Sequence, residues 1–300
     1  MRNSFLIGVG LGGYALTFLA AVVYLSTRRR RSLKERTPLN LKLFRGPGDS
    51  LRRQVQAFED NLLIYTLGVS LAPILAIALV EIALIGFGVS ENLQPALYLT
   101  LYLVAGVPTL LIAGRWYWLR VRENSERHFA YLGERAVAEE LAKLSGQGYR
   151  IFHDVPAEMG KRTFNLDHVA VGPSGVYAIE TKTRQMAPAR PGFKQHEVVY
   201  DGTRLIWPWG ESQSEIAQVM AQSRWLYTWI QQATGLTIPI RPLLAIPGWV
   251  VTEREPSGVR VVSPSHVPEV VLSQTSRILS DDQVDLIAGQ LDRRCRDIAI

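Results

Sequence analysis

Three long apolar stretches, two of them without a charged residue and one interrupted only by Glu81, most constrain how this chain can fold. The first runs from Phe5 to Leu25, the second from Leu62 past Glu81 to Phe87, and the third from Pro95 to Gly114. A helix rises about 1.5 Å per residue, so each stretch is long enough to cross the ~30 Å hydrocarbon core of a bilayer. The short polar connector between the second and third stretches is typical of a helical hairpin. We therefore expect three transmembrane helices.

The first stretch could also be a cleaved secretory signal, because it is N-terminal and follows Arg2. Its apolar part is longer than the roughly 7–15 residues of a signal core, and four arginines at residues 28–31 follow it directly, which is a stop-transfer pattern. We therefore favour an anchor over a signal.

The basic residues lie beside the apolar stretches. Residues 1–122 hold 14 Lys and Arg against 6 Asp and Glu, a net charge of +8, whereas residues 123–300 hold 19 against 21, a net charge of −2. The connector between the second and third stretches has no Lys or Arg. Basic residues collect on the cytoplasmic side of inner or plasma membranes, so we expect an outer N-terminus and a cytoplasmic C-terminal domain. A role as topology signals suffices to explain these basic residues, and a further role in binding anionic lipid or DNA stays open.

The chain has one cysteine, Cys295, which excludes an internal disulfide and fits a reducing compartment. Past residue 122 the pattern becomes that of a soluble α/β domain. We expect a transmembrane helix over residues 1–27, a basic cytoplasmic connector over 28–61, a transmembrane helical hairpin over 62–114, a juxtamembrane linker over 115–124 and a cytoplasmic domain with a C-terminal extension over 125–300.

Within the C-terminal domain, apolar residues recur at helical and strand periods in turn. Asp201 and Gly202 are expected to form the turn of a hairpin, and Asp49 or Ser50 to cap a short helix before the second apolar stretch. The order of elements favours an α/β sandwich over an eight-fold barrel. We expect helices over residues 125–145, 212–234 and 281–298, and strands over 149–155, 164–172, 175–182, 196–207 (the hairpin), 241–251 and 259–262.

Three charged residues interrupt two of these apolar strands. If the strands pair symmetrically across the turn GPSG, Asp167 faces Glu180, and alternation places Lys182 on the same face. Opposed Cβ atoms then lie about 5 Å apart, and two carboxylates at that distance repel by roughly 3 kcal/mol at an effective dielectric near 20. A divalent cation such as Mg²⁺, or Lys182 itself, could offset this repulsion. From spacing alone, a metal site and a charge-neutralising cluster without chemistry both stay open.

The segments GERAVAEEL, LDHVAVGPSGVYAIETK and SEIAQVMAQSRWL together resemble the nuclease-related domain family, NERD, of the PD-(D/E)XK restriction-endonuclease-like superfamily. The resemblance covers about residues 128–250. It implies a restriction-endonuclease-like α/β fold, a mixed sheet flanked by helices, which here would follow three transmembrane helices.

The resemblance also implies roles for five residues, all candidate catalytic residues. Asp167 and Glu180 would be the ligands of Mg²⁺ or Mn²⁺, and Lys182 the catalytic lysine. Glu134 would match the family's helical glutamate, an accessory acid near the metal, and Gln218 its glutamine. Without the resemblance, Glu134 and Gln218 would be ordinary polar residues of helices.

The chain departs from the family pattern at two places. Asn165 and Leu166 stand before Asp167 where members often have Gln and Ile, a change that leaves the metal centre intact. After Lys182, Thr183 and an irregular segment replace the Asn and the Trp and Gly segment common in the family, which affects contacts with substrate.

Other chemistry-bearing residues have simpler explanations. His168 should face away from Asp167 and is expected to be packed or at the surface, and His153 and His196 show no metal-ligand spacing. The tryptophans of WPWG and RWLYTWI could stack on bases, although packing in the core is commoner. Two roles for Glu81 stay open: a residue at the membrane interface, or a functional acid within the membrane.

The function we favour is a membrane-anchored, metal-dependent nuclease that hydrolyses phosphodiester bonds of nucleic acid, DNA before RNA, on the cytoplasmic face. The alternative is a catalytically inactive, membrane-tethered module of the same fold that binds nucleic acid or protein. The slight negative charge of residues 123–300, which gives no general attraction for DNA, speaks for it. A third function, transport through the apolar helices, rests on Glu81 alone. The sequence does not set the oligomeric state.

Overall fold

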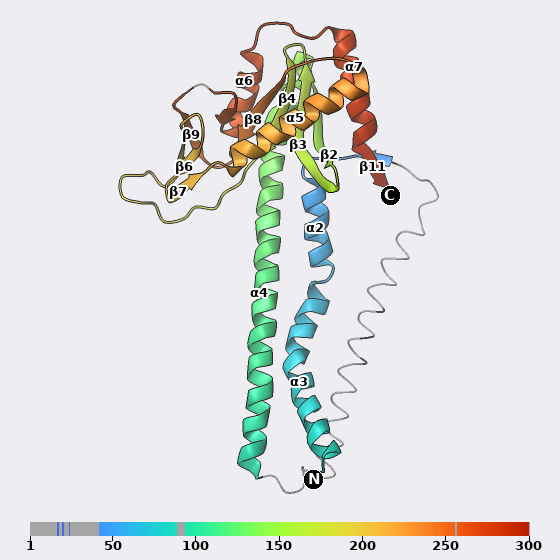
Figure 1. The fold of residues 1–300 in the computed structure, drawn as a ribbon, viewed down its shortest axis with the longest axis vertical. Coiled ribbons are helices and arrows are strands. Elements are labelled where there is room, and N and C mark those ends of the chain that lie inside the picture. The colour runs from blue at the N-terminus through green and yellow to red at the C-terminus, as the bar shows by residue number, and fades with distance from the viewer. Residues whose placement is uncertain are drawn as a thin grey trace. The chain divides into compact units, whose positions relative to one another are not determined.

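The computed structural model describes residues 42–88, 94–255 and 257–299, together with the helical positions 17, 20 and 24 (Figure 1). The chain divides into two compact units, one of Met1–Leu39 and Gln54–Glu126, the other of Asn40–Arg53 and Arg127–Ile300. Apart from those three positions, the first expected transmembrane stretch lies outside the described residues.

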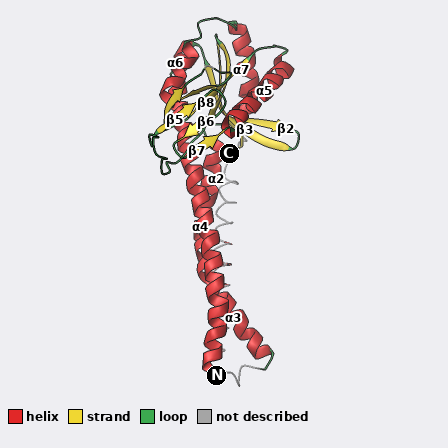
Figure 2. Ribbon diagram, turned by 60° about the vertical axis from the view of Figure 1, so that its left-hand side comes forward, coloured by secondary structure: helices red, strands yellow, loops and turns green. Residues whose placement is uncertain are grey.

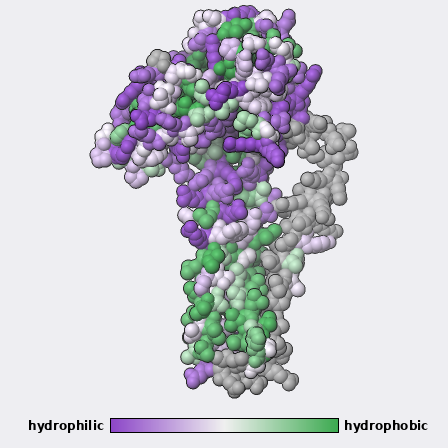
Figure 3. Space-filling view, in the orientation of Figure 1, coloured by the Kyte–Doolittle hydropathy of each residue, from purple (hydrophilic) through white to green (hydrophobic). Residues whose placement is uncertain are grey.

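Two helices are long and apolar enough to cross a membrane by length and composition. Helix α3 (Leu62–Gly86) has no buried residue, and α4 (Pro95–Ala142) begins with the third apolar stretch. Hydrophobic side chains gather on the surface of α3 and of the first part of α4 (Figure 3). In the described part of the chain, two of the three expected transmembrane helices are therefore present as helices of suitable length.

A polar contact joins α3 and α4 within the first unit. The hydroxyl of Tyr102 donates a hydrogen bond to the Glu81 carboxylate, and the hydroxyls of Thr66 and Tyr117 lie 3.2 Å apart. Hydrogen bonds between apolar helices help to fix their pairing in a membrane. Glu81 thus has a structural partner on the neighbouring helix.

Helix α4 runs without a break through residues 115–124, which the sequence suggested as a linker, into the helix expected over residues 125–145. No glycine or proline stands between Gly114 and Gly133 to end it. Arg122 and Glu126, one turn apart, form an ion pair at 3.0 Å that supports the helix here.

The second unit is built on a five-stranded mixed sheet in the order β10-β8-β4-β3-β2, which confirms the expected class of fold. β2, β3 and β4 are antiparallel neighbours, whereas β8 lies parallel to β4 and β10 parallel to β8. Figure 2 shows β2 and β3 continuing together as a hairpin. The strands are β2 (Arg150–Met159), β3 (Arg162–Gly172), β4 (Gly175–Thr181), β8 (Ile240–Ala245) and β10 (Arg260–Val262).

Helices cover both faces of this sheet. Side chains alternate along β3, so Val169 packs into one hydrophobic cluster and Ala170 into another on the opposite face. The Val169 cluster contains residues of α5 (Ser214–Thr234) and α7 (Asp281–Cys295). The Ala170 cluster contains residues of the last turns of α4 and of α6 (Val267–Leu272).

A second, four-stranded sheet has the order β7-β6-β5-β9. The hairpin expected around Asp201 and Gly202 is confirmed, because β5 and β6 pair antiparallel across this turn. The single strand expected over residues 241–251 is wrong: β8 and β9 belong to different sheets, since Pro247 and Gly248, the latter at φ +78°, interrupt the run. The strands are β5 (Glu197–Tyr200), β6 (Leu205–Trp207), β7 (Gly210–Ser212) and β9 (Val250–Glu253).

Part of the expected connector belongs to the second unit. Strand β1 (Lys42–Phe44) pairs with β11 (Arg296–Ala299), so the last residues expected as helix form a strand instead. Helix α2 (Asp49–Glu59) begins where a helix was expected. Neither expected cap acts as one, because Asp49 accepts a hydrogen bond from Gly46 and Ser50 bonds to Asp154.

The helical period over residues 125–145 correctly predicted a helix. Only some of the apolar residues expected on its buried face are in fact buried. Leu141 is fully buried with its neighbours in the core, as expected, whereas Leu132 is 46% exposed. The first turns of this segment therefore contribute little to the core.

This difference predicts unequal costs for two identical substitutions in α4. Leu141→Ala should lower the free energy of unfolding by about 2–5 kcal/mol, because it leaves a cavity, and Leu132→Ala by about 0.5 kcal/mol or less. Urea unfolding of the full chain in detergent, followed by tryptophan fluorescence, measures both. Equal costs would contradict the packing described here.

Candidate active site

The register of β3 and β4 brings two acids together. Val169 lies opposite Ala178, as predicted, and the same register places Asp167 opposite Glu180 just beyond the last ladder pair. The backbone N–H of Thr181 donates to Asp167 Oδ2 at 2.7 Å, and the charge of Glu180 contributes to a raised pKa of Asp167. The two acids are therefore neighbours at the end of β4.

Helix α5 holds Glu180 with two neutral amides. Gln218 Nε2 donates to Glu180 Oε1 at 2.5 Å, and Gln222 Nε2 donates to Glu180 Oε2 at 2.7 Å. The two glutamines are four residues apart and share one face of the helix. Gln218 thus lies where the sequence placed it, whereas Gln222 was missed, although its spacing from Gln218 could have indicated it.

Helix α4 brings Glu134 to the same end of the sheet. A Cβ atom on Gly133 would lie 2.2 Å from Thr183 Cγ2 and 3.5 Å from Pro247, so a glycine lets the helix pack this closely. Glu134 is 7% exposed. The adjacent Gly133 and Glu134 therefore act together. Gly133 lets α4 pack closely against the chain after β4, and this packing brings Glu134 near Asp167 and Glu180.

Lys182 directly follows β4. Its backbone N–H donates to the carbonyl of Ala245 at 2.9 Å, which extends the pairing of β4 with β8. The Lys182 charge lowers the pKa of both Asp167 and Glu180 against larger effects that raise them. The ammonium is thus close enough to influence both carboxyl groups.

The segment after Lys182, where the chain departs from the family pattern, is fixed by its own contacts. The Arg184 guanidinium donates to Glu215 Oε1 at 2.5 Å, and the Arg184 carbonyl accepts a hydrogen bond from Trp249 Nε1 at 3.0 Å. The guanidinium also lies 5.9 Å from the ring centre of Trp207. These contacts hold the chain in place immediately beyond the candidate lysine.

Burial and mutual repulsion raise the pKa values of the acids. Burial first, and then the charges of Asp154 and Glu180, raise the pKa of Glu134 to about 8. Burial, then the charges of Glu180 and Glu134, raise the pKa of Asp167 well above its usual range. Burial also raises the pKa of Glu180, although Lys182 opposes this rise. The cluster therefore retains protons that a nearby cation would displace.

The donor atoms fit a hard divalent cation. Asp167 and Glu180 offer carboxylate oxygens, and Mg²⁺ is commonly bound by one or two carboxylates and several waters. Among the residues described, no three His, Cys, Asp or Glu side chains are grouped as ready metal ligands. An ion here would rely on two carboxylates together with oxygens from other sources.

Comparison with known proteins bears on this region of the chain. Residues 130–247 match the model of the nuclease-related domain, NERD. The match confirms the family resemblance expected over residues 128–250, and all five candidate residues lie within this NERD region. No curated protein matches the chain. A crystal structure of a protein of unknown function, AF1548, is similar at 10% identity over 54% of this chain and 97% of that one, with a TM-score of 0.26, too low to compare folds.

One acid of the NERD region escaped the sequence analysis. In the ladder of β2 with β3, Asp154 and Asp167 both lie between the pairs His153–His168 and Val155–Leu166. Asp154 is 2% exposed, and its charge contributes to the raised pKa of Glu134. The two-residue turn that begins at Gly160 could have fixed this register, had β2 been paired with β3.

Histidines and tryptophans of the NERD region pack against one another. His168 is fully buried, and its Nδ1 lies 2.8 Å from His153 Nδ1, in agreement with the expected packed residue. Burial lowers the pKa of both rings, that of His153 to about 4, so the pair is neutral near pH 7. The tryptophans considered for base stacking contact one another: Trp207 stacks with Trp209, and Trp225 with Trp229. Trp249, just beyond residue 247, also contacts Trp207.

The raised pKa of Glu134 predicts how stability depends on pH without metal. The ordinary pKa is 4.5 and the folded one about 8, so the folded protein holds a proton that the unfolded chain releases. This contribution is fully present below pH 4.5 and is lost as the pH rises through 8. Glu134→Gln should remove the loss and make the protein more stable than wild type above pH 8, by on the order of 2 kcal/mol.

Urea unfolding in EDTA across this pH range measures the effect. Glu139→Gln, an exposed change on the same helix, is the control and should follow the wild type. An unchanged pH dependence in Glu134→Gln would show that Glu134 is ionised in the folded protein throughout.

Proposed function

We propose that this protein is a membrane-anchored, Mg²⁺-dependent nuclease that hydrolyses phosphodiester bonds of nucleic acid, with DNA as the first substrate to test and RNA as the second. The observation that carries the proposal is the pair of half-buried Asp167 and buried Glu180, followed directly by Lys182, in a region that matches the nuclease-related domain. Raised pKa values for several acids in one small volume are typical of functional sites.

In this proposal Asp167 and Glu180 hold the ion, Mg²⁺ or Mn²⁺. When bound, the ion would supply positive charge that offsets both the carboxylates and the charge that develops on a phosphate. The hydrogen bonds from Thr181 and from Gln218 keep the two carboxylates oriented. The order provided by these neutral donors avoids reorganisation during reaction.

Lys182 and Glu134 then have separate tasks. The ammonium of Lys182 can donate a hydrogen bond to a phosphate oxygen and offset its charge. Glu134, with a pKa of about 8, can hold or accept a proton near neutral pH, as a general acid or base must. We infer that it acts as the accessory acid of the site.

The apolar helices α3 and α4 support anchoring in a membrane, with residues 5–25 as a further span. The excess of Lys and Arg in residues 1–122 supports an outer N-terminus and a cytoplasmic nuclease region. Such a tether would restrict cleavage to nucleic acid that comes close to the membrane.

A catalytically inactive binding module of the same fold is the alternative. The net charge of −2 over residues 123–300 supports it, as does the altered segment after Lys182. Calorimetric titration with Mn²⁺ separates the two functions. A nuclease should give binding heat that Asp167→Asn removes, whereas a module that has lost the metal site should give none.

The nuclease proposal predicts that Lys182→Ala and Asp167→Asn each lower Mg²⁺-dependent cleavage by about 100-fold or more, because each removes a group that offsets or binds charge at the phosphate. Lys143→Ala removes an exposed lysine that directly follows α4 and should leave cleavage unchanged. Time courses with the purified full chain in detergent, on single- and double-stranded DNA and on RNA, measure the rates. Wild-type activity in Lys182→Ala would refute the assigned role.

A further inference from the structure

We propose that residues 45–50, the sequence RGPGDS, form a strap that positions the acids of the candidate active site. The strap precedes the second apolar stretch and lies outside residues 130–247, which match the nuclease-related domain. It nevertheless belongs to the same compact unit as the sheet. Its catalytic consequence rests on the proposed function, whereas its contacts stand independently of it.

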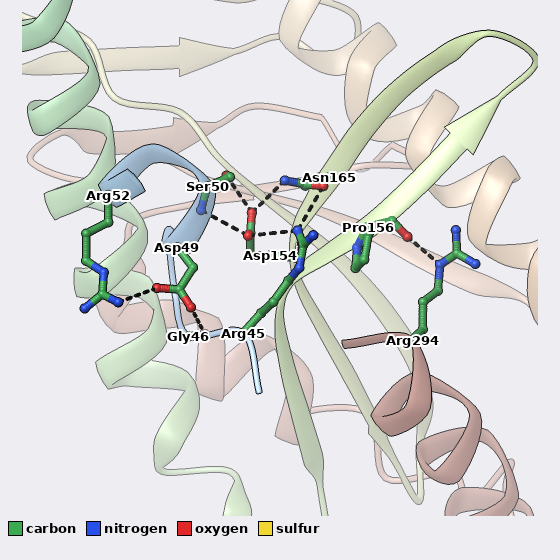
Figure 4. Close-up of polar contacts among 9 residues, drawn as sticks. All are labelled: Arg45, Gly46, Asp49, Ser50, Arg52, Asp154, Pro156, Asn165 and Arg294. Atoms are coloured by element: carbon green, nitrogen blue, oxygen red, sulfur yellow. Dashed lines mark hydrogen bonds and ion pairs between the residues drawn. The ribbon is translucent and has the colours of Figure 1, made fainter. Parts of the chain in front are cut away.

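The strap is anchored on Asp154 of β2 (Figure 4). Arg45 Nη1 and the Ser50 N–H each donate to Asp154 Oδ2 at 3.1 Å, and the Ser50 hydroxyl donates to Oδ1 at 2.7 Å. Asn165 Nδ2 donates to the same Oδ1 at 2.8 Å. A carboxylate accepts about four hydrogen bonds, so Asp154 is saturated and serves as an anchor rather than as a metal ligand.

The backbone at Asp154 agrees with this role. Its φ of +49° is the one positive value found at a non-glycine residue in the described ranges. L-residues seldom adopt this conformation, and it persists where surrounding contacts impose it. Arg45 Nη1 also donates to the Asp154 carbonyl at 3.2 Å. The strap thus grips both the side chain and the backbone of this residue.

Gly48 is the strap residue that contacts an acid of the candidate active site, Glu134. It packs directly against the Glu134 carboxyl group. Gly48 has φ +66°, and a Cβ atom there would lie 2.7 Å from Tyr131 Cδ2 and 3.4 Å from Glu134 Oε2. Glycine is therefore required both by the conformation and by the space. Glu134 is held by the packing of Gly133 on one side and by the strap on the other.

The strap also keeps its own shape. Asp49 Oδ2 accepts a hydrogen bond from the Gly46 N–H at 2.8 Å, and Asp49 pairs with Arg52 at 3.1 Å. The Arg52 N–H donates to the Gly48 carbonyl at 2.8 Å, where α2 begins. These local contacts stabilise the loop that places Gly48 beside Glu134.

Two glycines of the strap give a matched pair of variants. Gly48→Ala forces a side chain into the contact with Glu134 and Tyr131, whereas a Cβ on Gly46 meets nothing closer than 3.7 Å. In the full chain in detergent, Gly48→Ala should lower Mn²⁺ affinity by about 10-fold or more, because it displaces Glu134 beside the proposed ligands Asp167 and Glu180, and losing supporting contacts around metal ligands typically costs this much. Its kcat should fall similarly with little change in KM, and Gly46→Ala should match the wild type.

Thermal unfolding without metal checks that both variants fold. Should Gly48→Ala not fold, Ser50→Ala removes one anchor donor without adding bulk, and Ser50→Thr should restore function. A Gly48→Ala protein that binds Mn²⁺ and cleaves like the wild type would overturn the proposal. Faster cleavage in Gly48→Ala would overturn it too, because the strap would then obstruct the site rather than position it.

Hydrogen exchange tests the contact without any activity. The Gly48 amide should exchange about tenfold faster or more in Glu134→Ala than in the wild type, and Glu139→Ala should leave it unchanged. Equal exchange in Glu134→Ala and wild type would overturn the strap. A wild-type protein that neither binds Mn²⁺ nor cleaves, with exchange as expected, would refute the nuclease proposal and still support the contact between the strap and Glu134.

Discussion

The repulsion among buried carboxyl groups at the end of β4 determines how the rest of the site is built. Asp167, Glu180 and Glu134 each carry a raised pKa, mainly because they are buried. Among the described contacts, most of their supports are neutral donors, such as backbone N–H groups and the amides of Gln218 and Gln222. Neutral donors orient a carboxylate without cancelling its charge. The cluster is thus ordered yet left short of positive charge, which is the state that a divalent cation would relieve.

Local pattern predicted the pairing at the centre of this cluster. A short turn and the alternation of side chains fixed the register of β3 with β4, and so the meeting of Asp167 and Glu180. The same reasoning could have found Gln222, because it needs only the helical spacing from Gln218. The break between β8 and β9 was also readable, since Pro247 and Gly248 stand in the sequence. These features depend on residues that are near in the chain.

Other features could not be predicted, because they depend on contacts between distant residues. Arg45 and Ser50 meet Asp154 across more than 100 residues, and no local period encodes that meeting. The helical pattern around Leu132 gave the helix but not its exposed turns, since only the packed sheet decides which positions are covered. The metal, the substrate class and the membrane orientation depend on partners, and they stay predictions here.

The strap extends the proposed functional unit beyond residues 130–247, which match the nuclease-related domain. The family match begins at residue 130 and includes all five candidate residues, yet Glu134 also packs against Gly48, which lies outside that match. Residues 42–59 have defined structure throughout, from β1 paired with β11, through the strap, to α2. The segment that leads to the apolar helix α3 is therefore not a free linker at the point where it passes the acids. If anchoring and chemistry are linked in this protein, the link consists of the hydrogen bonds that the strap donates to Asp154 and of the packing of Gly48 against Glu134.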